Sequence, residues 1–484
     1  MNASRLSAAA AARIVWALFL VGLLIAVVML VRGQVGGDQL NLLARGWLLA
    51  AEGKWISYGN PMSTGGKAPG GITSLLVGLP LLLWRDHRAP NVVILLCHVL
   101  AYWILDGTLK RTLSPHERVL LAVLYWLNPW QLYFASFLWN PNYLFLFSSL
   151  HLWSCLVQRE RARFWPSFLQ AAGLALAFQV HASFLLLAVA SLLLWWRRYF
   201  RVHWGGAVAG GVLASLPLIP WAIEVTTHPA LVTEASKGFL GRGLILVFPL
   251  VRGLVYWLRY GSLYVSERMA DFDFSGLLGS DRWLGPGLSA VSQTVLALTA
   301  LVPLLANVRL WRGVRGPRPR GRWRARLTAP ANVCRGDREW LKGYARLCFL
   351  AAVLVFGLSP TTIMMWQGLI LLHAAILPVL LWAGALGRTH LASWVSKGTW
   401  IWAAVEIVLL VAIAFGNPQY RCGGRHTQRT DFGFNLRSDH PMMRELKIQQ
   451  TCPWPLNVPG GWWPDVLPEG PSPSSPSGRG GSGI

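Results

Sequence analysis

The fold class is indicated first by a long apolar run, IVWALFLVGLLIAVVML, which extends from Ile14 to Leu30. A helix of about 20 apolar residues can cross the hydrocarbon core of a bilayer. Comparable continuous runs recur along the chain, without the alternation of polar and apolar residues that is typical of membrane β-barrels. The sequence therefore predicts an all-α polytopic membrane protein.

The composition supports the same class. The 484 residues are 54% hydrophobic and 13% charged, with a mean hydropathy of +0.43, whereas soluble domains carry about 25% charged residues. The formal net charge is +24. Because most Arg and Lys residues lie in short segments between apolar runs, we interpret them as topology determinants and expect no nucleic-acid partner. The remaining alternative is that these Arg and Lys residues form a surface that binds polyanions.

Flanking charge orients the apolar runs. Arg5 and Arg13 place the start of the first run in the cytoplasm, and we interpret that run as a permanent anchor because no small-residue cleavage site accompanies it. The pattern predicts about eleven transmembrane helices and a carboxyl terminus on the outer side. The predicted spans cover approximately residues 13–32, 91–109, 119–137, 141–157, two short helices within 166–196, 205–223, 287–307, 345–358, 368–386 and 400–415.

The predicted organisation is one membrane domain, residues 1–415, followed by a periplasmic tail, residues 416–484, which is disordered at its end. Leu75–Trp84 is short and ends in charged residues, so we expect an interfacial helix there. The protein is expected in the bacterial inner membrane, with membrane lipids as partners. The predicted loops are a first periplasmic loop (33–90), a second periplasmic section (225–285) and a basic cytoplasmic loop (308–346) that touches anionic headgroups.

The cysteines predict a disulfide and no metal site. Cys422 and Cys452 are the two cysteines assigned to the oxidising outer side, and they are expected to form a disulfide. The alternative is two free thiols in a cytoplasmic tail. The other four cysteines have no metal-ligand spacing, so we expect no cofactor, and a divalent metal is possible without being indicated. These four are Cys97, Cys155, Cys334 and Cys348.

A candidate catalytic residue lies just beyond the first apolar run, in the segment GGDQLNLLARGW from Gly36 to Trp47. Water at the bilayer surface keeps a carboxylate charged there, so Asp38 could accept a proton from an attacking hydroxyl group. The alternative is that Asp38 only caps a helix from Gln39 to Glu52.

Further polar residues are predicted at the same face. Lys67 lies among glycines in TGGKAPGG (Thr64–Gly71), where backbone can approach a phosphate closely and the ammonium can stabilise a leaving phosphate. The alternative is that the Lys67 side chain only extends to the lipid headgroups. The other candidate substrate-binding residues are Arg45, Tyr58, Asn140, Asn142, His181 and Glu224.

The order of these motifs resembles membrane glycosyltransferases of the GT-C class, particularly the protein O-mannosyltransferase-like family and its lipid A aminoarabinose transferase relatives. The stretches that carry the resemblance are Asp38–Arg45, Glu52-Gly53-Lys54-Trp55, Lys67-Ala68-Pro69-Gly70 with Leu75–Leu83, Ser114–Arg118 and Leu127-Asn128-Pro129-Trp130. They lie within residues 15–200; the remainder is similar only in its helix pattern.

The resemblance implies that Asp38 is the base or orients it, that Lys67 meets the phosphate of a polyprenyl-phosphate sugar, and that His181 contributes a phosphate contact. One element departs from the family. Where an Arg-Pro-Asp-like element is usual, this chain has Trp139-Asn140-Pro141-Asn142, and the Asn142 amide cannot act as a base.

The implied activity is transfer of a sugar from a polyprenyl-phosphate donor to a lipid-linked glycan, a lipid A-type acceptor or a protein at the periplasmic face. A flippase or transporter of lipid-linked oligosaccharides is the main alternative, but it would be expected to show internal repeats and polar groups at the midplane. An O-antigen polymerase or acyltransferase is a further alternative, which does not predict a carboxylate so soon after the first helix.

Overall fold

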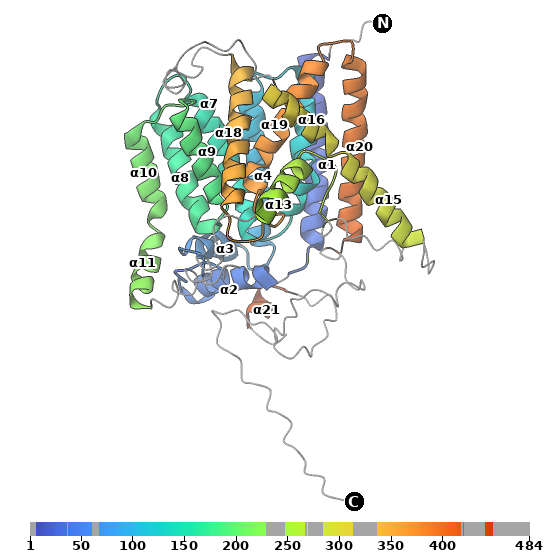
Figure 1. Ribbon diagram of the computed structural model, residues 1–484. Helices are drawn as coiled ribbons and strands as arrows, with labels where there is room; N and C mark the ends of the chain where they lie inside the picture. The colour runs from blue at the N-terminus through green and yellow to red at the C-terminus, as the bar shows by residue number, and fades with distance from the viewer. Residues whose placement is uncertain are drawn as a thin grey trace, which may run out of the picture.

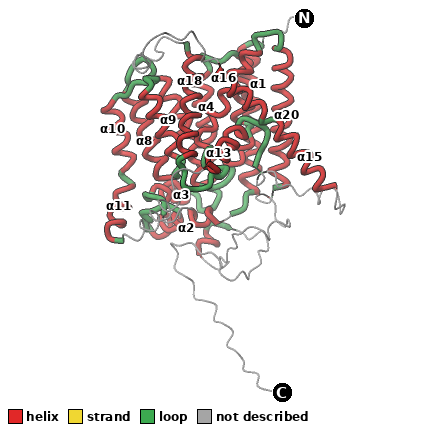
Figure 2. The backbone as a smooth tube through the Cα atoms, viewed as in Figure 1, coloured by secondary structure: helices red, strands yellow, loops and turns green. Residues whose placement is uncertain are grey.

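The computed structural model describes the chain in several ranges separated by gaps: residues 6–35, 37–60, 67–228, 247–266, 269, 284–312, 336–417, 420 and 441–448. The regular elements in these ranges are helices, most of which run side by side in one bundle (Figures 1 and 2). Cys334, Cys422 and Cys452 lie outside the described residues, and so does the whole basic segment 313–335.

Six helices in the described ranges are long and apolar enough to cross a membrane, or seven if one bent pair counts as a single span. Together they define a multi-pass helical membrane protein. The predicted number of eleven is not confirmed, because several predicted spans are shorter or broken helices. The six are α1 (Ala8–Arg32), α4 (Ala89–Leu109), Ala290–Arg312, α18 (Asp337–Gly357), Leu369–Leu386, which includes α19 (Leu372–Leu386), and α20 (Ala392–Gly416).

The prediction of one helix over 119–137 is wrong. The chain forms α5 (Pro115–Leu121), the π-helical turn η1 (Ala122–Trp126) and α6 (Pro129–Phe134). Pro129 has no backbone N–H and cannot continue the preceding helix. The Asn128 side chain instead accepts a 2.9 Å hydrogen bond from the Trp130 amide and so begins α6.

The predicted helix 205–223 is likewise interrupted. It consists of α10 (Trp204–Ser215) and α11 (Leu218–Thr227), which meet at an angle of 56°. Pro217 lies at the break, as expected for a residue that disrupts helical hydrogen bonding.

The basic loop predicted over 308–346 is helical at both ends. The Ala290–Arg312 span contains the end of α15 (Leu284–Leu298) and all of α16 (Leu301–Arg312). The helix α16 therefore extends past residue 308. At the other end, α18 begins at Asp337 instead of the predicted residue 345. Asp337 and Glu339 lie in its first turn, where acidic side chains interact favourably with the positive end of the helix dipole.

Two short helices, α2 (Gly37–Glu52) and α3 (Ile72–Leu83), lie at one end of the bundle, which we call the α2 face (Figure 1). The helix predicted at Leu75–Trp84 therefore begins three residues earlier. The start of α1 lies at the opposite end, which we call the N-terminal face. Glycines allow α2 and α3 to pack closely, because a Cβ on Gly46 would lie 2.4 Å from the Val77 side chain.

Part of the tail returns to the α2 face as α21 (Pro441–Glu445) (Figure 1). Its Glu445 carboxylate accepts hydrogen bonds from Trp47 at 2.9 Å and from Arg85 at 3.2 Å. The backbone amide of His87 also donates to the Leu446 carbonyl at 3.0 Å. These contacts join the tail to α2 and to the turn that follows α3.

The remaining helices lie between those already described (Figure 1). They are α7 (Leu144–Val157), α8 (Phe164–Val180), α9 (Phe184–Trp196) and α13 (Val247–Tyr260), with the short turns η2 (Asn140–Tyr143) and η3 (Leu369–Leu371). The helix α19 is the most enclosed of the six candidate spans.

Candidate functional site

Asp38 lies in the first turn of α2, and its side chain is exposed. Its Oδ2 atom accepts a 3.0 Å hydrogen bond from Trp139 Nε1. Its backbone carbonyl accepts a 3.3 Å hydrogen bond from Asn60 Nδ2. The helix begins at Gly37, so Asp38 does not precede it as the expected cap of a helix from Gln39. Its carboxylate is held instead by a residue from a distant part of the chain.

Trp139 is fixed by other aromatic rings. Its ring centroid lies 5.9 Å from that of Phe134 and 4.8 Å from that of Trp366, which follows α18. The η2 turn begins directly after Trp139. Asp38 therefore lies where α2, the η2 turn and the segment between α18 and α19 meet.

Lys67 belongs to a second cluster of predicted residues. The Lys67 Nζ atom lies 3.9 Å from the centroid of the Tyr58 ring, and the Arg45 guanidinium carbon lies 5.7 Å from it. Both are cation–π distances. Arg45 is fully buried and donates to the Asn41 carbonyl at 3.1 Å and to the Tyr58 carbonyl at 3.4 Å. The structure thus brings Arg45, Tyr58 and Lys67 together.

One backbone pairing links the two clusters. The Gly59 amide donates to the Ala68 carbonyl at 2.8 Å, and the Ala68 amide donates to the Asn60 carbonyl at 3.0 Å. This pairing holds the segment that carries Lys67 beside the segment that carries Tyr58. Because the Asn60 side chain also donates to the backbone carbonyl of Asp38, the backbone at Asp38 is linked through Asn60 to the segment that carries Lys67.

Asn140 and Asn142 are buried in the η2 turn. Asn142 donates from Nδ2 to the Phe137 carbonyl at 2.6 Å, and its own carbonyl contacts His98 Nε2 at 3.0 Å. The Oδ1 atoms of both asparagines, and both side-chain polar atoms of Asn41, have no hydrogen-bond partner among the described residues. Buried amide groups of this kind are able to hydrogen-bond a polar ligand.

His181 lies in the turn between α8 and α9, and its Nδ1 atom accepts hydrogen bonds from the Ser183 amide at 3.2 Å and the Ser183 hydroxyl at 2.8 Å. Nε2 then carries the proton of the neutral ring. Burial lowers the pKa of His181 to about 4. At neutral pH the ring therefore offers an N–H donor and no positive charge.

Glu224 is not brought into either cluster. It lies on α11, a helix with no buried residue among those described. Its backbone carbonyl accepts a 2.7 Å hydrogen bond from the His228 amide. Within the described ranges, no group of three or more His, Cys, Asp or Glu side chains is arranged to hold a metal ion.

Trp139 is one of the residues of this site that sequence reasoning missed. It was visible in the Trp139–Asn142 turn, but it is one of 27 tryptophans, most of which were interpretable as interfacial anchors. Asn41 and Asn60 were missed because nothing in a single sequence marks a buried amide.

The structure is similar to two solved structures of ArnT from Cupriavidus metallidurans. The one bound to undecaprenyl phosphate has a TM-score of 0.48 and 16% sequence identity, over 80% of this chain and 62% of that chain. The apo structure has a TM-score of 0.49 and 12% identity, over 87% of this chain and 82% of that chain. This chain thus spans less than two thirds of the length of the first structure.

No protein-family model matches the chain, and no curated protein matches it. ArnT is a lipid A aminoarabinose transferase of the GT-C class, which is the group that the sequence motifs resemble.

Proposed function

We propose that the chain is an integral membrane glycosyltransferase that uses a polyprenyl-phosphate-linked sugar donor at the α2 face. The observation that carries the proposal is the pairing of an exposed carboxylate, Asp38, with an ammonium group, Lys67, on hydrogen-bonded segments of one face. The GT-C-like order of motifs in the sequence supports it. Undecaprenyl phosphate, which is bound in one of the two similar structures, belongs to the proposed class of carrier.

The proposed reaction is a single displacement. The acceptor nucleophile attacks the anomeric carbon, the bond from that carbon to the phosphate oxygen breaks, and polyprenyl phosphate leaves. Asp38 takes the proton of the nucleophile. Its Oδ1 atom has no hydrogen-bond partner among the described residues, whereas Oδ2 is held by Trp139.

Lys67 is proposed to bind the donor phosphate and to stabilise the charge that develops as it leaves. Its contact with the Tyr58 ring positions the ammonium. Arg45 lies on the same ring and adds positive charge beneath it. Asn140, Asn142, His181 and Glu224 remain proposed substrate contacts.

We also propose the finer topology. If the shorter helices cross together with the six long ones, the chain crosses the inner membrane eleven times, and the α2 face is periplasmic. The acceptor is then a lipid-linked glycan, a lipid A-type molecule or a protein.

A transporter of lipid-linked oligosaccharides is the second candidate, and one observation favours it. Within the bundle, the Tyr344 hydroxyl contacts His151 Nδ1 at 2.9 Å and His373 Nε2 at 2.8 Å, and His151 Nε2 contacts Ser191 at 2.9 Å. Buried chains of polar groups of this kind occur along transport pathways.

Cleavage of the donor separates the two candidates. The purified chain would be incubated in vesicles with a labelled polyprenyl-phosphate sugar and a membrane extract. A transferase produces labelled acceptor together with one equivalent of free polyprenyl phosphate. Movement of intact donor across the bilayer, without release of polyprenyl phosphate, would support the transporter and contradict the proposal.

A further inference from the structure

A cavity of about 900 Å³ opens at the opposite end of the bundle from Asp38. It is formed where α4 and α7 end and where α8 and α18 begin, and Figure 1 places the start of α18 at the N-terminal face. The proposed transfer reaction uses none of its lining residues. Its basic lining side chains are Lys110, Arg111, Arg159, Arg161 and Arg163.

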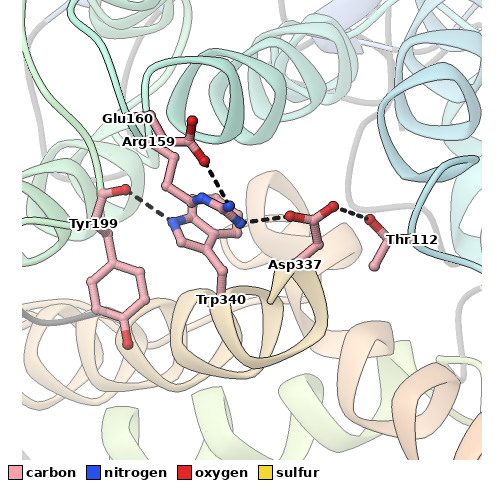
Figure 3. A network of polar contacts seen from close by, with 6 residues as sticks. All are labelled: Thr112, Arg159, Glu160, Tyr199, Asp337 and Trp340. Carbon is pink, nitrogen blue, oxygen red and sulfur yellow. Dashed lines mark hydrogen bonds and ion pairs between the residues drawn. The ribbon is translucent and has the colours of Figure 1, made fainter. Parts of the chain in front are cut away.

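The two acidic side chains of the cavity are already paired. Arg159 forms ion pairs with Asp337 at 2.6 Å and with Glu160 at 2.9 Å, and the Thr112 hydroxyl donates to Asp337 at 3.4 Å (Figure 3). The other four basic residues of the lining form no ion pair with any residue in the described part of the chain. The cavity therefore carries a net charge of three positive units that its own walls do not neutralise.

The cavity wall is anchored to the bundle. The Arg159–Asp337 ion pair joins the end of α7 to the start of α18. One turn further along α18, the buried Trp340 donates from Nε1 to the Tyr199 carbonyl at 2.9 Å (Figure 3). These contacts hold the acidic residue against Arg159, so a ligand does not have to displace Asp337 to reach the remaining cations.

Most of the other lining residues are apolar. Trp103, Leu150 and Trp153 line the cavity together with other aliphatic side chains. Tryptophan is the residue typical of the boundary between headgroups and acyl chains. A site that combines free cations with indole and aliphatic walls suits a ligand with both an anionic group and a hydrocarbon chain. A soluble anion would gain nothing from the apolar part.

We propose that this cavity binds the phosphate group of an anionic ligand, and that an anionic phospholipid of the surrounding leaflet supplies it. Lysine and arginine near the membrane surface attract such headgroups, and guanidinium groups bind phosphate oxygens in pairs. Arg161 and Arg163 flank the cavity just before α8. They can contact a headgroup without breaking an ion pair with any described residue.

The proposal is tested by titrating the detergent-solubilised full chain with phosphatidylglycerol, phosphatidylcholine or inorganic phosphate, with bound lipid counted by native mass spectrometry. Each surface cation contributes about fivefold in affinity. The double change Arg161→Gln and Arg163→Gln should therefore weaken phosphatidylglycerol binding about 25-fold. The control is Arg197→Gln with Arg201→Gln, which removes two charges outside the cavity lining and should leave that binding unchanged.

Selective binding of phosphatidylglycerol that only the cavity variant loses supports the proposal. Equal losses in both variants, or equal binding of the two lipids by the unaltered chain, would overturn it. Inorganic phosphate binding as tightly as phosphatidylglycerol would overturn the assignment to a lipid. If the double change lowers the melting temperature, Arg161→Gln alone should still show a fivefold loss.

Discussion

The Trp139 indole donates a 3.0 Å hydrogen bond to the carboxylate of Asp38, across 101 positions of sequence. This contact ties the first turn of α2 to the η2 turn, and it leaves the second carboxylate oxygen without a hydrogen bond to any described residue. A base held by one oxygen is oriented while the other oxygen remains able to take a proton.

Trp139→Phe should keep the aromatic packing and remove this hydrogen bond. We expect turnover to fall about tenfold, since a hydrogen bond to a charged group contributes about 1.5–3 kcal/mol and the exposed position reduces that value. Donor binding should be unchanged. The matched control is Trp165→Phe, because that indole is 66% exposed on α8. Equal rates for Trp139→Phe and the unaltered chain would show that the bond does not orient the base.

Lys67→Met should weaken binding of the polyprenyl-phosphate sugar about tenfold, because a charge-assisted contact with phosphate is lost. Tyr58→Leu should act in the same direction through loss of the ring beneath the ammonium. Tyr58→Phe, which keeps the ring, should bind the donor as the unaltered chain does. Binding is measured by equilibrium titration of the purified protein, and a donor affinity independent of residue 67 would exclude Lys67 from the phosphate site.

Gly46→Ala should destabilise the packing of α2 on α3. The new methyl group would lie 2.4 Å from Val77 Cγ1 and 2.9 Å from the Val77 backbone, and forced overpacking costs about 1–3 kcal/mol. Gly107→Ala is the control, because no atom lies within 4 Å of its added methyl group. Thermal unfolding in detergent should therefore show a lower midpoint only for Gly46→Ala; a midpoint equal to that of the control would contradict the close approach.

His181 should make stability depend on pH. Burial lowers its pKa to about 4, below the value of about 6.5 in an unfolded chain. The stability contributed by the neutral ring is complete above a pH of about 6.5 and is lost as the pH falls through about 4. His181→Asn should flatten this part of the stability profile. Identical profiles for the two proteins between pH 7 and 4 would argue against a neutral His181 ring in the folded protein.

The helical class and the approximate position of most helices were predictable, because each long apolar run indicates where a helix lies in the sequence. The breaks were harder to predict. Pro129 and Pro217 are visible in the sequence, but whether a proline kinks a span or divides it depends on neighbours that satisfy the freed backbone groups. The early start of α18 was hidden because Asp337 and Arg338 look like loop residues until their ion pairs with Arg159 and Glu117 are seen.

Asp38 and Lys67 could be selected as site residues because each is a charged group in a short polar stretch beside an apolar run. Their surroundings could not be predicted from one sequence. The contact between Trp139 and Asp38, and the stacking of Lys67 on Tyr58, depend on how the η2 turn and residues 58–60 fold across the end of the bundle. Tertiary contacts of this kind leave no periodic signal.

The most direct test of the central claim compares Asp38→Asn with the unaltered chain in transfer from a purified polyprenyl-phosphate sugar to a membrane extract. The amide keeps the shape of the side chain and can still accept the Trp139 hydrogen bond, but it cannot take the proton. We expect turnover to fall by about two to four orders of magnitude, with donor binding retained. Undiminished turnover by Asp38→Asn would contradict the assignment of Asp38 as the base.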